Sequence, residues 1–140
     1  MSHLKEWVEY GVLGLLLALS VWAVAIAVAR FYHYRRIDVA AWGKRVELEA
    51  DLTVGLTTIA TVAANAPYVG LLGTVLGIML TFQTLGLTGD IDVKTIMTGL
   101  ALALKATAAG LLVAIPCVAL NNALRRRVKL LLARWDAQHG

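Results

Sequence analysis

Charged residues and cysteine are scarce in this sequence, and their scarcity excludes several kinds of protein. Only 16% of the 140 residues are charged and 59% are hydrophobic, whereas a soluble domain of this size usually carries more charge. The single cysteine, Cys117, cannot form a disulfide within the chain, and it lies inside an apolar run as a small buried residue would. The composition therefore indicates an integral membrane protein.

The sequence also lacks the residue groups that mark an enzyme or a metal site. It has no nucleophile–base pair, no metal-ligand cluster and no phosphate-binding loop, and His3, His33 and His139 lie in terminal or connecting positions. The net charge of +4 could suit nucleic acid, but the basic residues gather at the ends of apolar runs, as they do in oriented membrane proteins. We therefore expect no catalysis, no cofactor, no metal and no nucleic-acid partner.

Three apolar runs predict three membrane-spanning helices in one domain, residues 1–140. They cover residues 10–29, 59–85 and 96–120, approximately, and the two later runs exceed the length of one span, so we expect tilt or extension beyond the bilayer. Glu6 and Glu9 precede the first run, which argues against a signal peptide. The charged connector and the basic tail are expected to continue the first and third helices into water, giving an all-α fold.

The basic residues predict the orientation of the three spans. The residues that follow the first and third spans are Arg30, Arg35, Arg36, Lys44, Arg45, Arg125, Arg126, Arg127, Lys129 and Arg134. On the other side lie only Lys5 and Lys94. The positive-inside rule therefore places the connector and the C-terminus in the cytoplasm, and the N-terminus and the turn with Asp90 and Asp92 outside.

The second predicted span carries small residues and threonines on one helical face. The members of this stripe, at helical spacing, are Ala66, Gly70, Gly73, Thr74, Gly77 and Thr81. Small residues let membrane helices approach closely, so we expect tight packing along this stripe. Pro67 is expected to bend or start the helix, because it frees a carbonyl from its helical donor.

The third predicted span repeats this design. Its stripe consists of Gly99, Ala103, Ala106, Thr107, Gly110, Ala114, Cys117 and Asn121. Pro116 is expected to kink the helix. Each of the two helices thus has a threonine at mid-depth, and a hydroxyl can bind water or a carboxyl group in either protonation state. The alternative for each threonine is a hydrogen bond back to its own preceding turn.

Lys105 is the only charged residue inside a predicted span, which makes it a candidate functional residue. It points away from Thr107, because two residues on a helix are separated by about 200°. We expect no Asp or Glu of this chain at its depth, so the lysine is neutral, faces water or receives its anion from a partner. A structural lysine satisfied by carbonyls or lipid headgroups is the alternative. For the same reason, a proton path through this chain would need an acid from another protein.

Two stretches, APYVGLLGTVLGIMLTF (66–82) and ALKATAAGLLVAIPCVALNN (103–122), closely resemble the second and third membrane helices of the MotA/TolQ/ExbB proton-channel family, and its ExbB members most. The resemblance implies a bacterial inner-membrane protein whose copies form a ring, typically a pentamer, around an ExbD-like dimer. Each ExbD-like helix supplies a membrane aspartate. Proton flow then drives a motion that passes to a TonB-like protein and powers import across the outer membrane.

The resemblance also assigns roles to residues. Thr74 and Thr107 match the family's threonines and are expected to face the partner's aspartate. The residues that match the family's packing motif are Pro67, Gly70, Gly73 and Gly77. Independently of the resemblance, the charge of Lys105 makes it a further predicted residue of the proton pathway, and the third span adds Gly110 and Pro116 to the predicted packing residues. Leu102 stands where many relatives have a glutamate, and the short connector replaces a long cytoplasmic insertion, which argues against a flagellar stator. A TolQ-like role in envelope maintenance and a passive membrane scaffold are the alternatives.

Overall fold

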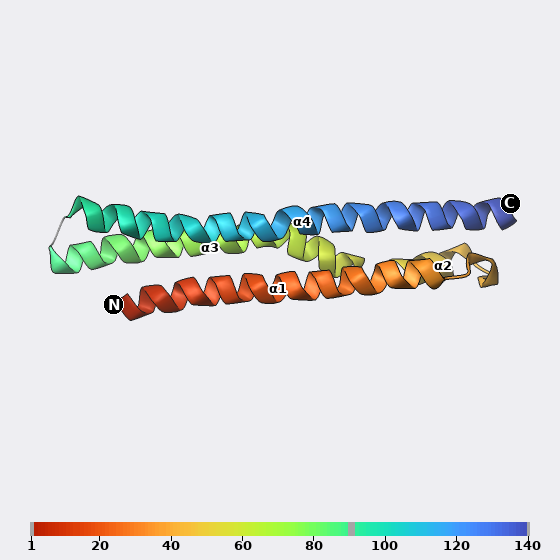
Figure 1. The fold of residues 1–140 in the computed structure, drawn as a ribbon, viewed down its shortest axis with the longest axis horizontal. Helices are drawn as coiled ribbons and strands as arrows, with labels where there is room; N and C mark the ends of the chain where they lie inside the picture. Colours follow the sequence, from red (N-terminus) through yellow and green to blue (C-terminus); the bar gives the residue numbers. More distant parts are fainter. Residues whose placement is uncertain (1, 90–91, 140) are drawn as a thin grey trace.

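A computed structural model of the chain describes residues 2–89 and 92–139, so Asp90 of the predicted outer turn lies outside the described residues. The elements are α1 (Ser2–Arg36), the 3-10 helix η1 (Val39–Ala41), α2 (Arg45–Leu52), α3 (Leu56–Thr88) and α4 (Val93–His139). The three long helices lie side by side, and no strand occurs among the described residues (Figure 1). The prediction of an all-α fold is confirmed.

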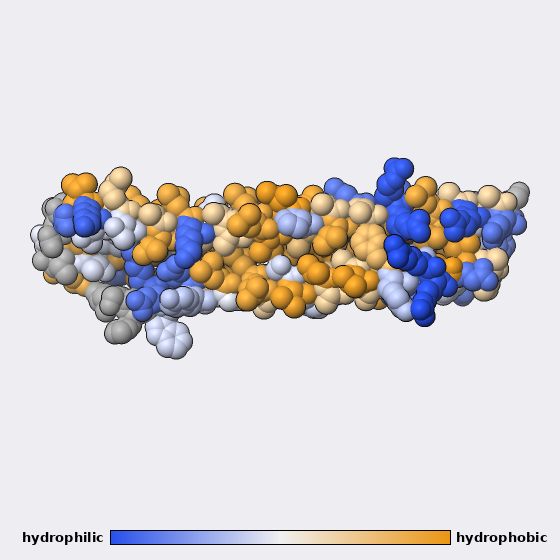
Figure 2. Space-filling model, viewed as in Figure 1, coloured by the Kyte–Doolittle hydropathy of each residue, from blue (hydrophilic) through white to orange (hydrophobic). Residues whose placement is uncertain are grey.

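All three long helices are long and apolar enough to cross a membrane. The qualifying segments are Leu4–Arg36, Leu56–Leu87 and Val93–His139, each longer than the apolar run predicted from the sequence. Figure 2 shows the corresponding surface, an apolar belt around the middle of the molecule with hydrophilic residues gathered toward both ends. At 1.5 Å per residue α4 is about 70 Å long, so it extends well beyond a bilayer core of about 30 Å.

Both prolines lie inside continuous helices. Pro67 is in the interior of α3, which begins at Leu56, so the alternative that Pro67 starts this helix is wrong. Pro116 lies in the interior of α4, and the kink expected there stays a prediction. Glycines flank α3 at its two ends. Gly55 before it and Gly89 after it have φ values of 82° and 69°, a left-handed conformation that glycine adopts without strain.

The small stripes of α3 and α4 pack against each other within one chain. A Cβ added to Gly70 would lie 2.6 Å from the carbonyl oxygen of Ala106, and one added to Gly110 would lie 2.6 Å from the carbonyl oxygen of Ala66. At this separation the two backbones touch without intervening side chains. At Gly70 and Gly110 an added Cβ would meet the backbone of the opposite helix, so α3 and α4 approach closely along the predicted stripes.

Helix α1 covers the groove between α3 and α4. Its Leu16 packs on Ala66 and Ala114, and its Ala23 packs in a second buried cluster that includes Cys117. Cys117 is therefore the buried small residue expected from the sequence. The C-terminal end of α3 and the N-terminal end of α4 extend beyond the N-terminal end of α1 (Figure 1).

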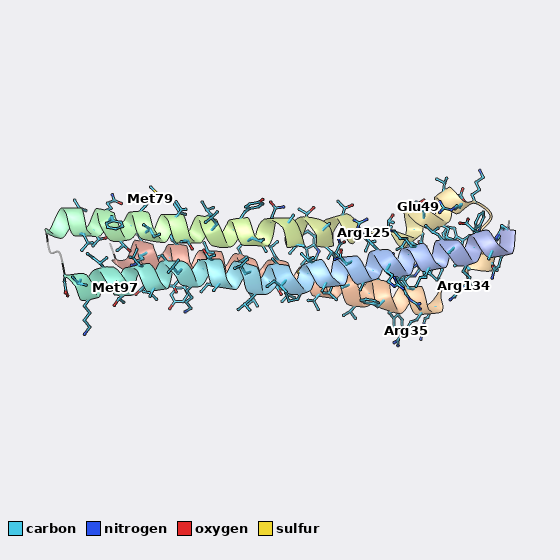
Figure 3. All side chains as sticks on the ribbon, turned by 90° about the horizontal axis from the view of Figure 1, so that it is seen from above. Arg35, Glu49, Met79, Met97, Arg125 and Arg134 are labelled. Carbon is cyan, nitrogen blue, oxygen red and sulfur yellow. The ribbon has the colours of Figure 1, made fainter. Side chains whose placement is uncertain are left out.

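The connector between α1 and α3 folds onto the basic end of the bundle. Leu48 and Leu52 of α2 are fully buried in a cluster with Leu124 and Leu131 of α4. Further contacts between the connector and the long helices are His33–Asp51 (2.7 Å), Arg45–Asp136 (3.1 Å) and the bond from Trp135 Nε1 to the Trp42 carbonyl oxygen (2.9 Å). Arg35, Arg125 and Arg134 lie at this same end, away from Met79 and Met97 (Figure 3).

We expect Gly110→Ala to destabilise the bundle by about 1–3 kcal/mol, because the added methyl group meets a backbone carbonyl that cannot move aside. Gly14→Ala is the matched control, since a Cβ there meets nothing within 4 Å. Unfolding of the purified protein by SDS in mixed micelles measures the difference. Equal unfolding midpoints for Gly110→Ala and Gly14→Ala would contradict the described α3–α4 contact.

Candidate functional site

Thr74 of α3 and Thr107 of α4 meet where the two helices touch. Their Oγ1 atoms are hydrogen-bonded to each other, and Thr74 Oγ1 also donates to the carbonyl oxygen of Ala103 at 2.8 Å. Thr74 is 6% exposed and Thr107 is half-buried. The hydroxyl groups reach each other because Gly70 and Gly110 hold the helices close together. We call Thr74 and Thr107 the hydroxyl pair.

The direction of these hydrogen bonds follows from the chemistry of the acceptor. A carbonyl oxygen can only accept, so the hydroxyl hydrogen of Thr74 points to Ala103, at a shorter distance than the 3.3 Å to the Gly70 carbonyl oxygen. Thr74 Oγ1 then accepts the hydrogen of Thr107. The Thr107 oxygen keeps lone pairs for a further donor. A neutral carboxylic acid can supply that donor, whereas a carboxylate has no hydrogen to give.

Two other threonines of α3 bond back to the preceding turn of their own helix, which was the alternative considered for each threonine of the stripes. Thr61 donates to the Thr57 carbonyl oxygen and Thr81 to the Gly77 carbonyl oxygen, both at 2.8 Å and both one turn back in the same helix. Thr74 differs, because its shortest bond to a carbonyl crosses to α4. The hydroxyl of Thr74 thus belongs to the interhelical contact and not only to its own helix.

The hydroxyl pair lies on the side of the α3–α4 contact that faces away from α1. Gly73 marks the α1 side, since a Cβ added there would lie 3.0 Å from Val12 of α1, and the next residue on a helix is turned by about 100°. The large exposed residues on the side of Thr74 and Thr107 are Leu71, Val75, Leu104 and Leu111. We call this surface, with Thr107 at its centre, the α3–α4 face.

The expectation that no carboxylate of this chain lies at the depth of Lys105 is wrong. Helix α1 begins at Ser2, and Glu9 lies beside Lys105, with 3.7 Å between Oε1 and Nζ. The side chain of Glu9 is 18% exposed and that of Lys105 is 61% exposed. Lys105 thus lies on the α1 side of the bundle and is not brought to the hydroxyl pair. The helical spacing could have predicted this position, because Glu9 lies on the same face of α1 as Val12 and Leu16, which pack against the other helices.

Comparison with known proteins identifies the family of the chain. Residues 35–137, which include α2, α3 and nearly all of α4, match the model of the MotA/TolQ/ExbB proton channel family. The chain belongs to this family. Thr74 and Thr107 both lie in the matched region, and with the three long apolar helices the match shows a multi-pass membrane protein related to proton channels.

Several relatives within the family cover nearly the whole chain. The chain is 51% identical over 140 residues to the biopolymer transport protein ExbB of Aquifex aeolicus, a match that covers all of this chain and 95% of the relative. It is 51% identical over 136 residues to the putative biopolymer transport protein ExbB-like 2 of Helicobacter pylori, with 97% and 91% covered. The Tol-Pal system protein TolQ of Pseudomonas aeruginosa is 42% identical over 87 residues, which is 62% of this chain and 38% of the relative.

We expect Thr74→Val to lower the free energy of unfolding by about 1 kcal/mol, because it removes the hydroxyl that joins α3 to α4 while keeping the side-chain shape. Thr74→Ser keeps the hydroxyl and should unfold nearly as the unmodified protein does. Thr61→Val is the matched control, since its exposed hydroxyl bonds only within α3 in the described contacts. Unfolding by SDS measures all three variants, and equal losses for Thr74→Val and Thr61→Val would contradict the interhelical bond.

Proposed function

We propose that this chain is the ring-forming subunit of a proton-driven energy transducer in a bacterial inner membrane, of the ExbB–ExbD type, which powers TonB-dependent import across the outer membrane. The single observation that carries the proposal is the hydroxyl pair, which presents a hydrogen-bond acceptor on an otherwise apolar surface. The match to a proton-channel family and the near full-length identity with relatives named ExbB support it.

The α3–α4 face selects between the two protonation states of a visiting acid. A protonated aspartic acid can donate its hydrogen to Thr107, and the surrounding leucine and valine side chains keep water away. An aspartate anion finds no donor there, and moving an unpaired charge into apolar surroundings is costly. The acid therefore passes this point only when protonated, and deprotonation elsewhere makes its return unfavourable. This difference would give the motion of the partner a direction.

No acidic residue of α3 or α4 lies near the hydroxyl pair, because α3 has none and those next to or within α4, Asp92 and Asp136, are near its two ends. Glu9 of α1 lies on the other side of the bundle, beside Lys105, so the acid would come from a partner. We propose an ExbD-like single-span protein that supplies a membrane aspartate. Five copies of this chain, with their α3–α4 faces turned inward, would surround it. The motion of the partner would then pass to a TonB-like protein.

The charge distribution supports an orientation with the basic end in the cytoplasm. The arginines near the C-terminal end of α1 and those in the second half of α4 lie at one end of the bundle, where Arg35, Arg125 and Arg134 are visible in Figure 3. Basic residues close to spans are retained on the cytoplasmic side. The N-terminus would then lie in the periplasm and the C-terminus in the cytoplasm.

We expect Thr107→Val to reduce proton flux by about tenfold or more, because one lost hydrogen bond of about 1.5 kcal/mol in the conducting state lowers the rate by that factor. Thr107→Ser should retain most of the flux, and Thr61→Val should conduct like the unmodified protein. The measurement uses liposomes that contain the chain with its single-span partner, under a pH gradient. Co-purification of the partner checks that each variant still assembles.

Three outcomes would contradict parts of this proposal. Normal flux and normal import with Thr107→Val would exclude the hydroxyl mechanism. A flux no higher than that of bare lipid for the unmodified complex would indicate a passive scaffold. Rescue of tol-pathway mutants instead of tonB-pathway mutants would indicate the TolQ-like role, although the matched TolQ protein covers a smaller part of the chain than the relatives named ExbB do.

A further inference from the structure

Helix α1 inserts charged groups against α3 and α4 on the side opposite to the hydroxyl pair. Lys5 Nζ donates to Thr81 Oγ1 at 2.8 Å, and a Cβ added to Gly99 would lie 2.9 Å from this nitrogen. One turn further along α1, Glu9 is paired with Lys105. A positive and a negative side chain of α1 thus both occupy space that the small residues of the other helices leave open.

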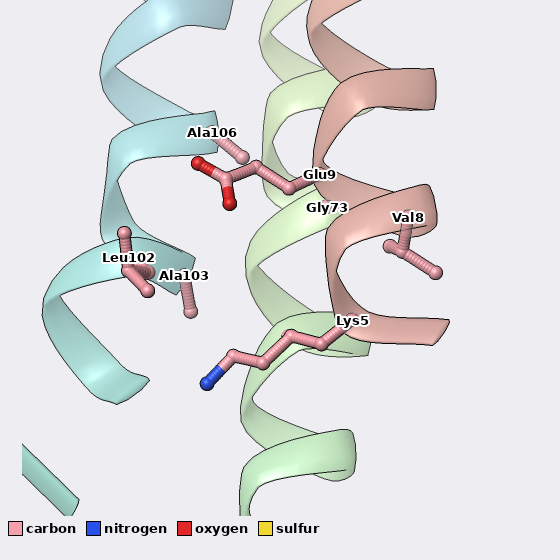
Figure 4. A pocket seen from close by; sticks show the side chains of 8 residues that line it. Lys5, Val8, Glu9, Gly73, Leu102, Ala103 and Ala106 are labelled. Carbon is pink, nitrogen blue, oxygen red and sulfur yellow. The ribbon is translucent and has the colours of Figure 1, made fainter. Parts of the chain in front are cut away.

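A small cavity lies between these groups (Figure 4). Its volume, measured at the positions that a water centre could take, is ≈ 20 Å³, which is enough for about one water molecule. Figure 4 shows Lys5 and Glu9 extending from α1 toward the α4 segment with Leu102, Ala103 and Ala106. Glu9 can therefore exchange hydrogen bonds with a water molecule inside the bundle.

The cavity and the hydroxyl pair lie on two sides of the same thin layer of residues. Ala103 lines the cavity, and its carbonyl oxygen is the acceptor for Thr74. Gly73 and Ala106 also line the cavity and immediately precede the two threonines in the sequence. Small residues, Gly73, Ala103 and Ala106, therefore lie both at the cavity and next to the hydroxyl pair.

A purely structural role explains the position of Glu9 poorly. Its closest contact to Lys105 is 3.7 Å and the lysine side chain is 61% exposed, so the pair is loose. The carboxylate itself is only 18% exposed, and a loose pair offsets little of the cost of desolvating its charge. A largely buried acid beside a cavity that can hold water suits a group that gains and loses a proton.

We propose that Glu9 is a proton-binding carboxylate of the channel, located on the α1 side of the layer that carries the hydroxyl pair; this inference rests on the proposed function. Glu9 takes a proton from water and passes it to the partner's carboxylate, and the neutral acid so formed is the species that Thr107 accepts. Glu9 returns to the carboxylate in each cycle, so that each proton bound is also released. The charged groups that face it are Lys5 and Lys105, while α3 presents Gly73 and Gly77.

The test compares Glu9→Gln with Glu6→Gln in liposomes that contain the chain and its single-span partner. Glu6 is exposed on the same helix and does not line the cavity, so it is the matched control. Flux is recorded at outside pH values on both sides of the range in which glutamate side chains titrate. We expect Glu9→Gln to lose about tenfold or more of the flux and to flatten its pH profile, with the complex still assembled. Glu6→Gln should match the unmodified protein.

Lys105→Gln distinguishes a proton-binding role of Glu9 from a role in which Glu9 only holds α1 to α4 through its ion pair. It removes the ion pair but keeps the acid, so we expect conduction to persist with a displaced pH profile. The inference is overturned if Glu9→Gln conducts with the unmodified pH profile, if it loses the assembled complex, or if Lys105→Gln and Glu9→Gln have the same effect. If the unmodified complex conducts no protons, the proposed function is contradicted, whatever the role of Glu9.

Discussion

The direct contact between the backbones of α3 and α4 is the constraint on which the other features depend. At Gly70 and Gly110 there is no space for a Cβ, because each faces a carbonyl oxygen of the opposite helix. This separation lets the hydroxyl of Thr74 reach the Ala103 carbonyl oxygen and the hydroxyl of Thr107. Larger residues would move the helices apart by more than a hydrogen bond can span, and each threonine would then bond only within its own helix.

The same small residues have a second consequence on the opposite side of the contact. Since Gly73, Gly77 and Ala103 have almost no side chain, α1 can place Lys5 and Glu9 close to the middle of the three-helix contact. One layer of small residues therefore has the hydroxyl pair on one side and charged groups on the other. Helix α1, predicted from the sequence only as an apolar span, contributes ionisable groups to the interior.

Features that depend on one helix at a time could be predicted from the sequence, and features that depend on how helices align could not. A period of 3.6 residues was enough to place Gly70, Thr74 and Thr107 on packed faces. The Glu9–Lys105 pair was missed, because it depends on how far α1 slides along α4, which the packing of residues such as Leu16 determines. The acid that we propose at Thr107 would come from another protein, so this sequence could not reveal it.

The two polar sites of the bundle differ in the groups that surround a carboxyl group. At the α3–α4 face, Thr107 offers an acceptor among apolar side chains, which suits a neutral acid that donates a hydrogen. At Glu9, Lys105 Nζ lies 3.7 Å from the carboxylate and Lys5 lines the same cavity, so a negative charge there has basic neighbours. Under the proposed mechanism, a proton released from Glu9 neutralises the partner's carboxylate before that acid reaches Thr107. The transfer then leaves the negative charge beside the lysines and brings only the neutral acid to the apolar face.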